Sequence, residues 1–103
     1  MREMTDINKF YDTIKNNSCA LEFYGSNCPA CKQLERLIDN ISSYYPHIEF
    51  IKVNVEFYPE IAGEFAVVSV PTTIFINYGV NIGMEIGAVG KDKIIRYLNA
   101  MED

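Results

Sequence analysis

The segment FYGSNCPACK, residues 23–32, joins a predicted strand to a predicted helix. Residues 19–24 are mostly apolar and predict a buried strand. Residues 25–27 (Gly, Ser and Asn) are typical of a turn. Pro29 is favoured at the first helical position, where a backbone N–H has no intrahelical partner, and apolar residues recur at helical spacing after it. The segment therefore predicts that Cys28 lies at a helix N-terminus, directly after a strand.

Helix and strand patterns alternate on both sides of this segment. The spacing of apolar residues predicts helices over residues 6–15 and 28–45, from Pro59, and around residues 94–98. Apolar runs predict further strands over residues 48–55, 72–76 and 81–86. The tight turn at Tyr78-Gly79 makes the last two strands an antiparallel hairpin. We therefore expect an α/β fold, with a central mixed β-sheet flanked by helices on both faces.

Length and composition limit the classes of protein that the chain can belong to. A length of 103 residues is typical of one domain, and we expect residues 1–103 to form a single domain. A net charge of −5 argues against nucleic acid as a partner, because phosphate binding needs a basic surface. Residues 1–6 lack the apolar run of a signal peptide, and no apolar stretch reaches the length of a membrane span. We expect a cytoplasmic monomer that binds neither nucleic acid nor membrane.

Cys28 and Cys31 form a Cys-x-x-Cys motif, which among alternating strands and helices indicates redox or metal chemistry. The thiolate is the reactive form, and a free thiol with a pKa near 8.5 is only about 3% ionised at pH 7. The unpaired N–H groups and partial positive charge of a helix N-terminus favour a thiolate at Cys28. Cys31 lies one helical turn along and can attack a mixed disulfide formed by Cys28. We therefore expect Cys28 to be exposed and attacking, and Cys31 to be shielded and resolving.

A metal site is the alternative interpretation of this pair. Zinc needs two further ligands, and the candidates are Cys19 and His47, neither of which stands at a spacing typical of metal ligands. We interpret Cys19 as a small core residue of its strand and His47 as a surface residue of a loop. The sequence therefore favours redox chemistry and predicts no metal.

Several segments together resemble the thioredoxin family over nearly the whole chain. Residues 23–32 resemble its active-site segment, Val70-Pro71-Thr72 its cis-proline loop, Lys52–Val55 its central strand, and Gly87-Ala88 the glycine near its substrate groove. The resemblance implies a thioredoxin fold and a thiol–disulfide oxidoreductase that uses a Cys28–Cys31 disulfide and no other cofactor. It further implies reduction of protein disulfides, with a thioredoxin reductase as electron donor, as part of electron transport and cell redox homeostasis.

The resemblance assigns substrate binding to residues near the cysteines. Pro71 would be a cis-proline that faces them, and the backbone of Val70 would pair with an extended substrate peptide. Gly87 would border the substrate groove. From the residues alone, Pro71 is equally consistent with a trans proline at a strand edge, since only about one X–Pro bond in twenty is cis.

Glu22 is an acid within an apolar strand, where burial is costly unless the group is protonated or paired. The family has a buried carboxylic acid at this position, which assists proton transfer to and from the resolving cysteine. The resemblance therefore implies that Glu22 is a proton acceptor with a raised pKa that acts on Cys31 through water, and that Lys52 modulates it. The alternative is a solvated, inert residue at the rim of the sheet.

The chain departs from the family around Cys28. Cys-Pro-Ala-Cys replaces the usual Cys-Gly-Pro-Cys, which leaves the reduction potential open. Tyr24 and Asn27 replace two tryptophans, and we expect Tyr24, Pro29 and Ala30 to contact the substrate. The motif is closer to the Cys-Pro-x-Cys of glutaredoxins and some disulfide oxidases. A glutathione-dependent or more oxidising exchange enzyme is therefore the alternative function, and a non-catalytic binding module of the same fold is a third hypothesis.

Overall fold

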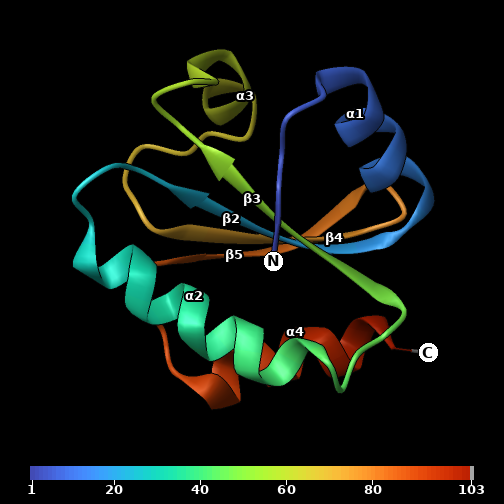
Figure 1. Ribbon diagram of the computed structural model, residues 1–103. Coiled ribbons are helices and arrows are strands. Elements are labelled where there is room, and N and C mark those ends of the chain that lie inside the picture. The colour runs from blue at the N-terminus through green and yellow to red at the C-terminus, as the bar shows by residue number, and fades with distance from the viewer. Residues whose placement is uncertain (103) are drawn as a thin grey trace.

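The computed structural model describes residues 1–102 and shows strands and helices in alternation (Figure 1). The strands are β1 (Arg2–Glu3), β2 (Ser18–Tyr24), β3 (Ile48–Asn54), β4 (Thr72–Asn77) and β5 (Val80–Ile86). The helices are α1 (Ile7–Asn16), α2 (Pro29–Ser42), α3 (Pro59–Glu64) and α4 (Lys91–Met101). Among the helices of residues 1–102, none has the length and apolar character that crossing a membrane requires.

The strands form one mixed sheet in the order β1-β3-β2-β4-β5. Strands β1, β3 and β2 run parallel, whereas β4 is antiparallel to β2 and β5 is antiparallel to β4. The β4–β5 hairpin turns at Tyr78 and Gly79, which both have positive φ, 49° and 86°. The mixed sheet and the antiparallel hairpin that the sequence predicts are confirmed.

Helices cover both faces of this sheet, with α1 and α3 on one side and α2 and α4 on the other (Figure 1). Side chains alternate along a strand, so β2 contributes to both cores. Leu21 and Phe23 belong to the core beneath α1 and α3, and Ala20 belongs to the core beneath α2 and α4. Glu22, two residues after Ala20, therefore faces the helix that carries the cysteines.

Helix α2 is shorter than the sequence predicts, because it ends at Ser42 and not at Tyr45. The backbone N–H groups of Tyr44 and Tyr45 donate to the carbonyl oxygens of Ile41 and Ser42, three residues earlier, which tightens the chain into turns. The Tyr45 hydroxyl donates to Asn99 Oδ1 of α4 at 2.7 Å. Tyr45 therefore lies beyond the end of α2, where its side chain packs against the core beneath α2 and α4 and its hydroxyl binds α4.

Candidate active site

The turn between β2 and α2 presents the cysteine pair at the helix N-terminus. Asn27 has a φ of 52°, a left-handed conformation that asparagine adopts more readily than most residues. Cys28 is the N-cap of α2, its Sγ accepts the backbone N–H of Cys31 at 3.2 Å, and Pro29 is the first helical residue. Cys28 and Cys31 are joined as a disulfide. The predicted placement of the pair is confirmed.

The two cysteines differ in their access to solvent. Cys31 is 2% exposed, whereas Cys28 is half-buried. Next to them in the first turn of α2, Pro29 is exposed and Ala30 is half-buried. The shielding expected for Cys31 is present, whereas Cys28 is half-buried and not fully exposed as the sequence predicts. Cys28 is nevertheless the more accessible of the two cysteines.

Glu56 holds the turn that leads to Cys28. The Ser26 backbone N–H donates to Glu56 Oε2 at 2.6 Å, and the Ser26 hydroxyl donates to Glu56 Oε1 at 3.1 Å. Asn54 Oδ1 in turn accepts the backbone N–H of Glu56 at 2.8 Å. Nothing in the sequence singles out Glu56 for this contact. The parallel register of Tyr24 with Asn54 brings the ends of β2 and β3 together, and that register cannot be read from local patterns.

The loop before β4 and the residue after β5 meet at the same end of the sheet. The Val70–Pro71 peptide bond is cis, as expected, and Pro71 is buried. Thr72, the next residue, pairs with Phe23 near the end of β2. Gly87 donates its N–H to the carbonyl oxygen of Pro71 at 2.8 Å and has a φ of 92°, which favours glycine. The fold therefore brings the predicted substrate-binding residues Pro71 and Gly87 into contact.

A row of polar residues crosses the whole sheet on the face covered by α2 and α4. The backbone registers pair Glu3 with Lys52, Lys52 with Glu22, Glu22 with Thr73, and Thr73 with Glu85. Residues paired across neighbouring strands direct their side chains to the same face. At the centre of the row, Glu22 and Thr73 are both 0% exposed. Within residues 1–102, no hydrogen-bond partner contacts either carboxyl oxygen of Glu22 or the Thr73 hydroxyl.

Glu22 is thus a buried acid, and the alternative of a solvated residue at the sheet rim is wrong. Burial, and to a smaller extent the nearby carboxylate of Glu35, raise the pKa of its carboxyl to about 8, although Lys52 acts to lower it. A carboxyl with this pKa exchanges its proton close to neutral pH. The raised pKa that the sequence predicts for Glu22 is confirmed.

Lys52 lies beside Glu22 in the sheet, but its ammonium group is bound elsewhere. Lys52 Nζ donates to Glu35 Oε1 of α2 at 2.7 Å and lies 3.9 Å from Glu3 Oε1. It also lies 5.3 Å from the centre of the Tyr24 ring, whose hydroxyl donates to Glu3 Oε1 at 2.7 Å. The hydrogen bond with Glu35 raises the pKa of Lys52. Lys52 and Tyr24 are thus predicted site residues, whereas the carboxylates of Glu3 and Glu35 that bind them were not predicted from the sequence.

Two grooves flank the site. One, of about 460 Å³, brings together three of the predicted site residues, Tyr24, Cys31 and Lys52, and is also lined by Glu35. The other, of about 400 Å³, lies beside Val70 and is lined mainly by small and apolar side chains. A partner that reaches Cys28 therefore meets a charged groove on the α2 side and an apolar groove on the Val70 side.

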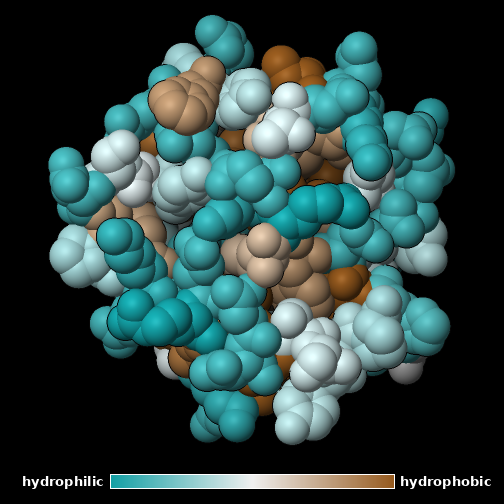
Figure 2. Space-filling view, viewed as in Figure 1, coloured by the Kyte–Doolittle hydropathy of each residue, from teal (hydrophilic) through white to brown (hydrophobic). Residues whose placement is uncertain are grey.

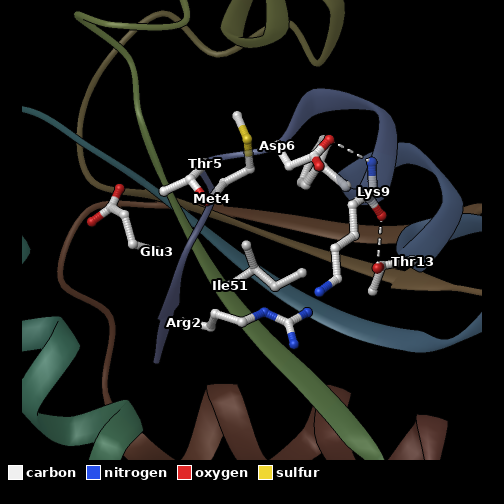
Figure 3. Close-up of a pocket in the computed structure, with 9 residues that line it drawn as sticks. Arg2, Glu3, Met4, Thr5, Asp6, Lys9, Thr13 and Ile51 are labelled. Atoms are coloured by element: carbon white, nitrogen blue, oxygen red, sulfur yellow. Dashed lines mark hydrogen bonds between the residues drawn. The ribbon is translucent and has the colours of Figure 1, made fainter.

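A smaller pocket, of about 70 Å³, lies between β1, α1 and β3 on the other face of the sheet (Figure 3). Asp6 Oδ1 accepts the backbone N–H of Lys9 there at 3.1 Å and caps α1. Figure 3 shows Glu3 pointing away from Asp6 and Lys9, which is consistent with its contacts to Tyr24 and Lys52. The described residues that line this pocket include neither cysteine of the disulfide.

The residues considered as metal ligands lie apart from the disulfide. Cys19 is buried in β2, its Sγ lies 3.8 Å from the carbonyl oxygens of Thr13 and Asn17, and burial raises the pKa of its thiol to about 12. His47 is exposed in the loop before β3. Within residues 1–102, no three His, Cys, Asp or Glu side chains lie close enough to hold a metal ion. The interpretation of Cys19 as a core residue is confirmed.

Comparison with known proteins identifies the family. The thioredoxin family model matches residues 2–100. The chain is 25% identical to a thioredoxin of Chlamydia trachomatis over 99 residues, which cover 96% of this chain and 97% of that protein. It is 33% identical over 99 residues to a bifunctional thioredoxin reductase/thioredoxin of Mycobacterium leprae, covering 94% of this chain and 22% of that protein.

A solved structure shows the same fold. Oxidised mitochondrial thioredoxin 3 of Saccharomyces cerevisiae superposes with a TM-score of 0.86 and 28% identity, over 97% of this chain and 94% of the yeast chain. Sequence, fold and a paired Cys28 and Cys31 agree, so the expected thioredoxin fold is confirmed and the disulfide is the redox group. The chain belongs to the thioredoxin family and is a protein-disulfide oxidoreductase.

Proposed function

We propose that this protein is a dithiol reductant of protein disulfides in which Cys28 attacks and Cys31 resolves. The Cys28 thiolate forms a bond to one substrate sulfur while the substrate S–S bond breaks, and the other substrate sulfur leaves as a thiolate. Cys31 then gives its proton to Glu22 and attacks the Cys28 sulfur. The Cys28–Cys31 disulfide forms, the second substrate sulfur leaves, and two electrons have passed to the substrate.

One observation carries this assignment of roles, namely the asymmetry of the helix cap. Cys28 is half-buried, and its Sγ accepts the backbone N–H of Cys31 at 3.2 Å, an interaction that favours a negatively charged sulfur. Cys31 is 2% exposed and cannot meet a folded partner first. The difference in access and the stabilisation of a thiolate at Cys28 therefore support these attacking and resolving roles.

Glu22 is proposed as the group that takes and returns the Cys31 proton, through water. Its pKa of about 8 is near the pH at which a cell works, and proton transfer is most efficient when the two are close. Lys52 is proposed to modulate Glu22, because an ammonium group in the neighbouring strand stabilises the carboxylate form.

Substrate is proposed to bind as an extended peptide across the end of the sheet. The backbone of Val70, before the buried Pro71, provides an N–H and a carbonyl for strand-like pairing, and Gly87 borders the same position. Tyr24, Pro29 and Ala30 are proposed to contact the substrate on the α2 side. Because backbone pairing does not read side chains, this mode suits many protein substrates.

A thioredoxin reductase is proposed as the electron donor. The Mycobacterium leprae relative combines a thioredoxin reductase with a thioredoxin in one chain, which supports such a partnership here. We further propose that residues 1–103 act as a single-domain cytoplasmic monomer with the disulfide as its only redox group, and that the protein serves electron transport in cell redox homeostasis.

A trapping experiment tests this function. Reduced Cys31→Ser protein should accumulate a covalent mixed disulfide with a disulfide-containing substrate such as insulin, because Cys28 still attacks a substrate disulfide and no second thiol resolves the product. Cys28→Ser should trap none, and the control Cys19→Ala should turn over normally.

A second experiment identifies the electron donor. Insulin reduction by the wild-type protein is compared with NADPH and a thioredoxin reductase, or with glutathione, as donor. Turnover with glutathione alone would support the glutaredoxin-like alternative. If neither trapping nor turnover occurs, the result would support the hypothesis of a non-catalytic binding module.

A further inference from the structure

The Lys52 ammonium is held by carboxylates other than the one it neighbours in the sheet. Lys52 Nζ lies 2.7 Å from Glu35 Oε1 and 3.9 Å from Glu3 Oε1. Within residues 1–102, no ion pair joins Lys52 to Glu22, although the two residues are directly paired between β3 and β2. A lysine that could neutralise the buried acid is therefore drawn away from it.

Helix α2, which carries the disulfide, places Glu35 where it can bind the Lys52 ammonium. Glu35 lies one turn after Cys31 in α2, so both side chains lie on the same side of the helix and line the same groove with Lys52. The side chains of Lys52 and Glu35 are only 23% and 25% exposed. Ion pairs shielded to this degree are screened less by water than those on the open surface.

The other charged groups around Glu22 do not replace Lys52. Helix α2 contributes Glu35 and Asp39, strand β1 contributes Glu3, and all of these carboxylates raise the pKa of Glu22. Strand β3 contributes Lys52, the one group among them that lowers it. The facing residue of β4 is the uncharged Thr73, and Tyr24 on the same strand as Glu22 directs its hydroxyl to Glu3. The position of the Lys52 ammonium therefore decides how strongly the carboxylate form of Glu22 is stabilised.

We propose that Glu35 is a positioning residue for disulfide exchange, which holds the Lys52 ammonium away from Glu22 and so keeps Glu22 protonated at neutral pH. The inference rests on the proposed role of Glu22 as the proton partner of Cys31. In that role, a protonated Glu22 assists the direction in which Cys31 leaves the disulfide and takes up a proton. When Cys31 instead attacks the mixed disulfide, Glu22 must be a carboxylate to accept the Cys31 proton. The rate of this resolving step therefore rises with pH until Glu22 has lost its own proton.

The direct test measures the protonation of Glu22 in the oxidised protein, by titrating its carboxyl carbon in ¹³C NMR. Glu35→Gln should lower the pKa of Glu22 by about 1 pH unit, because it removes one carboxylate and frees Lys52 to approach. Glu35→Asp, which keeps the charge, should restore most of the wild-type pKa. The matched control Glu60→Gln removes the same charge from α3, on the other face of the sheet, and should leave the pKa of Glu22 unchanged.

Repeating the Glu35→Gln substitution in a protein that lacks Lys52 distinguishes two effects of Glu35 on the pKa of Glu22. One is the position in which Glu35 holds Lys52, and the other is the negative charge of Glu35 itself. In Lys52→Met protein, Glu35→Gln should lower the pKa of Glu22 by clearly less than in the wild type. An equal fall in both backgrounds, or no fall in either, would overturn the proposal. The pH profile of release from the mixed disulfide should move to lower pH in Glu35→Gln by the same shift. If the NMR pKa moves and this profile does not, Glu35 still positions Lys52 and sets the protonation of Glu22, but the proposed role of Glu22 in disulfide exchange fails.

Discussion

At the level of single residues, the burial of Glu22 couples the chemistry of the site to the stability of the protein. The carboxyl is 0% exposed and has a pKa of about 8, against 4.5 for a solvated glutamate. Between these two pH values the unfolded chain carries a carboxylate, whereas the folded chain holds a proton on Glu22. Folding therefore binds a proton in this range, and the free energy of unfolding must fall as the pH rises through it.

Glu22→Gln should abolish this pH dependence. In the oxidised wild type, the free energy of unfolding should fall between pH 5 and pH 8 by up to about 1.4 kcal/mol per pH unit. The Gln variant has no proton to lose, so its stability should stay nearly flat over the same range and exceed that of the wild type at pH 8. Urea unfolding of both proteins at a series of pH values measures the difference. Glu60→Gln, on the surface, should keep the wild-type slope, and a flat wild-type profile would contradict the prediction.

The residues around this site were predictable to different degrees. Glu22 stands out in the sequence because an acid interrupts an apolar strand, and the cysteine pair stands out by its spacing. Glu35 and Glu56 look like ordinary surface acids on a helix and in a turn. Their partners lie 17 and 30 residues away in the chain, so only the assembled fold shows what they bind.

At the level of elements, the connection from β2 to α2 determines where Cys28 stands, and Glu56 fixes this connection from β3. Glu56→Ala removes both acceptors of the Ser26 backbone N–H and hydroxyl and should lower the free energy of unfolding by roughly 1–2 kcal/mol. Ser26→Ala removes only the hydroxyl contact and should cost about half as much. Urea unfolding measures both. Glu60→Ala is the control. If it lowers the free energy of unfolding as much as Glu56→Ala does, the contribution of Glu56 does not depend on its contacts with Ser26.

The helices and strands could be predicted from the spacing of apolar residues, since each predicted element occurs in the structure. The end of α2 did not follow, because Tyr45 fits the apolar helical pattern while its hydroxyl is used outside the helix, on Asn99. Strand β1 has only the residues Arg2 and Glu3, too few to show an alternation. Its place beside β3 is set by pairing with Ile51 and Lys52, which no local pattern encodes.

At the level of the whole molecule, the order of strands gathers distant segments at one end of the sheet. Strand β2 ends there before Cys28, β4 begins there after Pro71, and β5 ends there before Gly87. The antiparallel arrangement of β4 against β2 makes this possible, because the start of one strand then lies beside the end of the other. The strand order of the sheet therefore determines which residues meet at the site. A substrate that approaches this site also experiences the net charge of the whole protein.

That charge predicts a preference among substrates. The protein carries a net charge of −5, and polar and charged side chains dominate the face shown in Figure 2. A negative molecule attracts basic partners over distances of about a Debye length, roughly 10 Å at 0.1 M salt and 3 Å at 1 M. Of two disulfide peptides matched in length and differing only in Lys or Glu flanks, the basic one should therefore have the higher kcat/KM, by several-fold at low salt.

Salt distinguishes this long-range attraction from a specific contact. As the salt concentration rises to 1 M, the ratio of the two kcat/KM values should approach one, because screening removes the attraction between charges that do not touch. A third peptide with neutral flanks should show little dependence on salt, which controls for effects of ionic strength on the chemistry. A ratio that persists at high salt would mean that flanking charges bind directly in the charged groove beside Cys31. A faster reaction of the acidic peptide would show that local charges near the disulfide outweigh the net charge of the molecule.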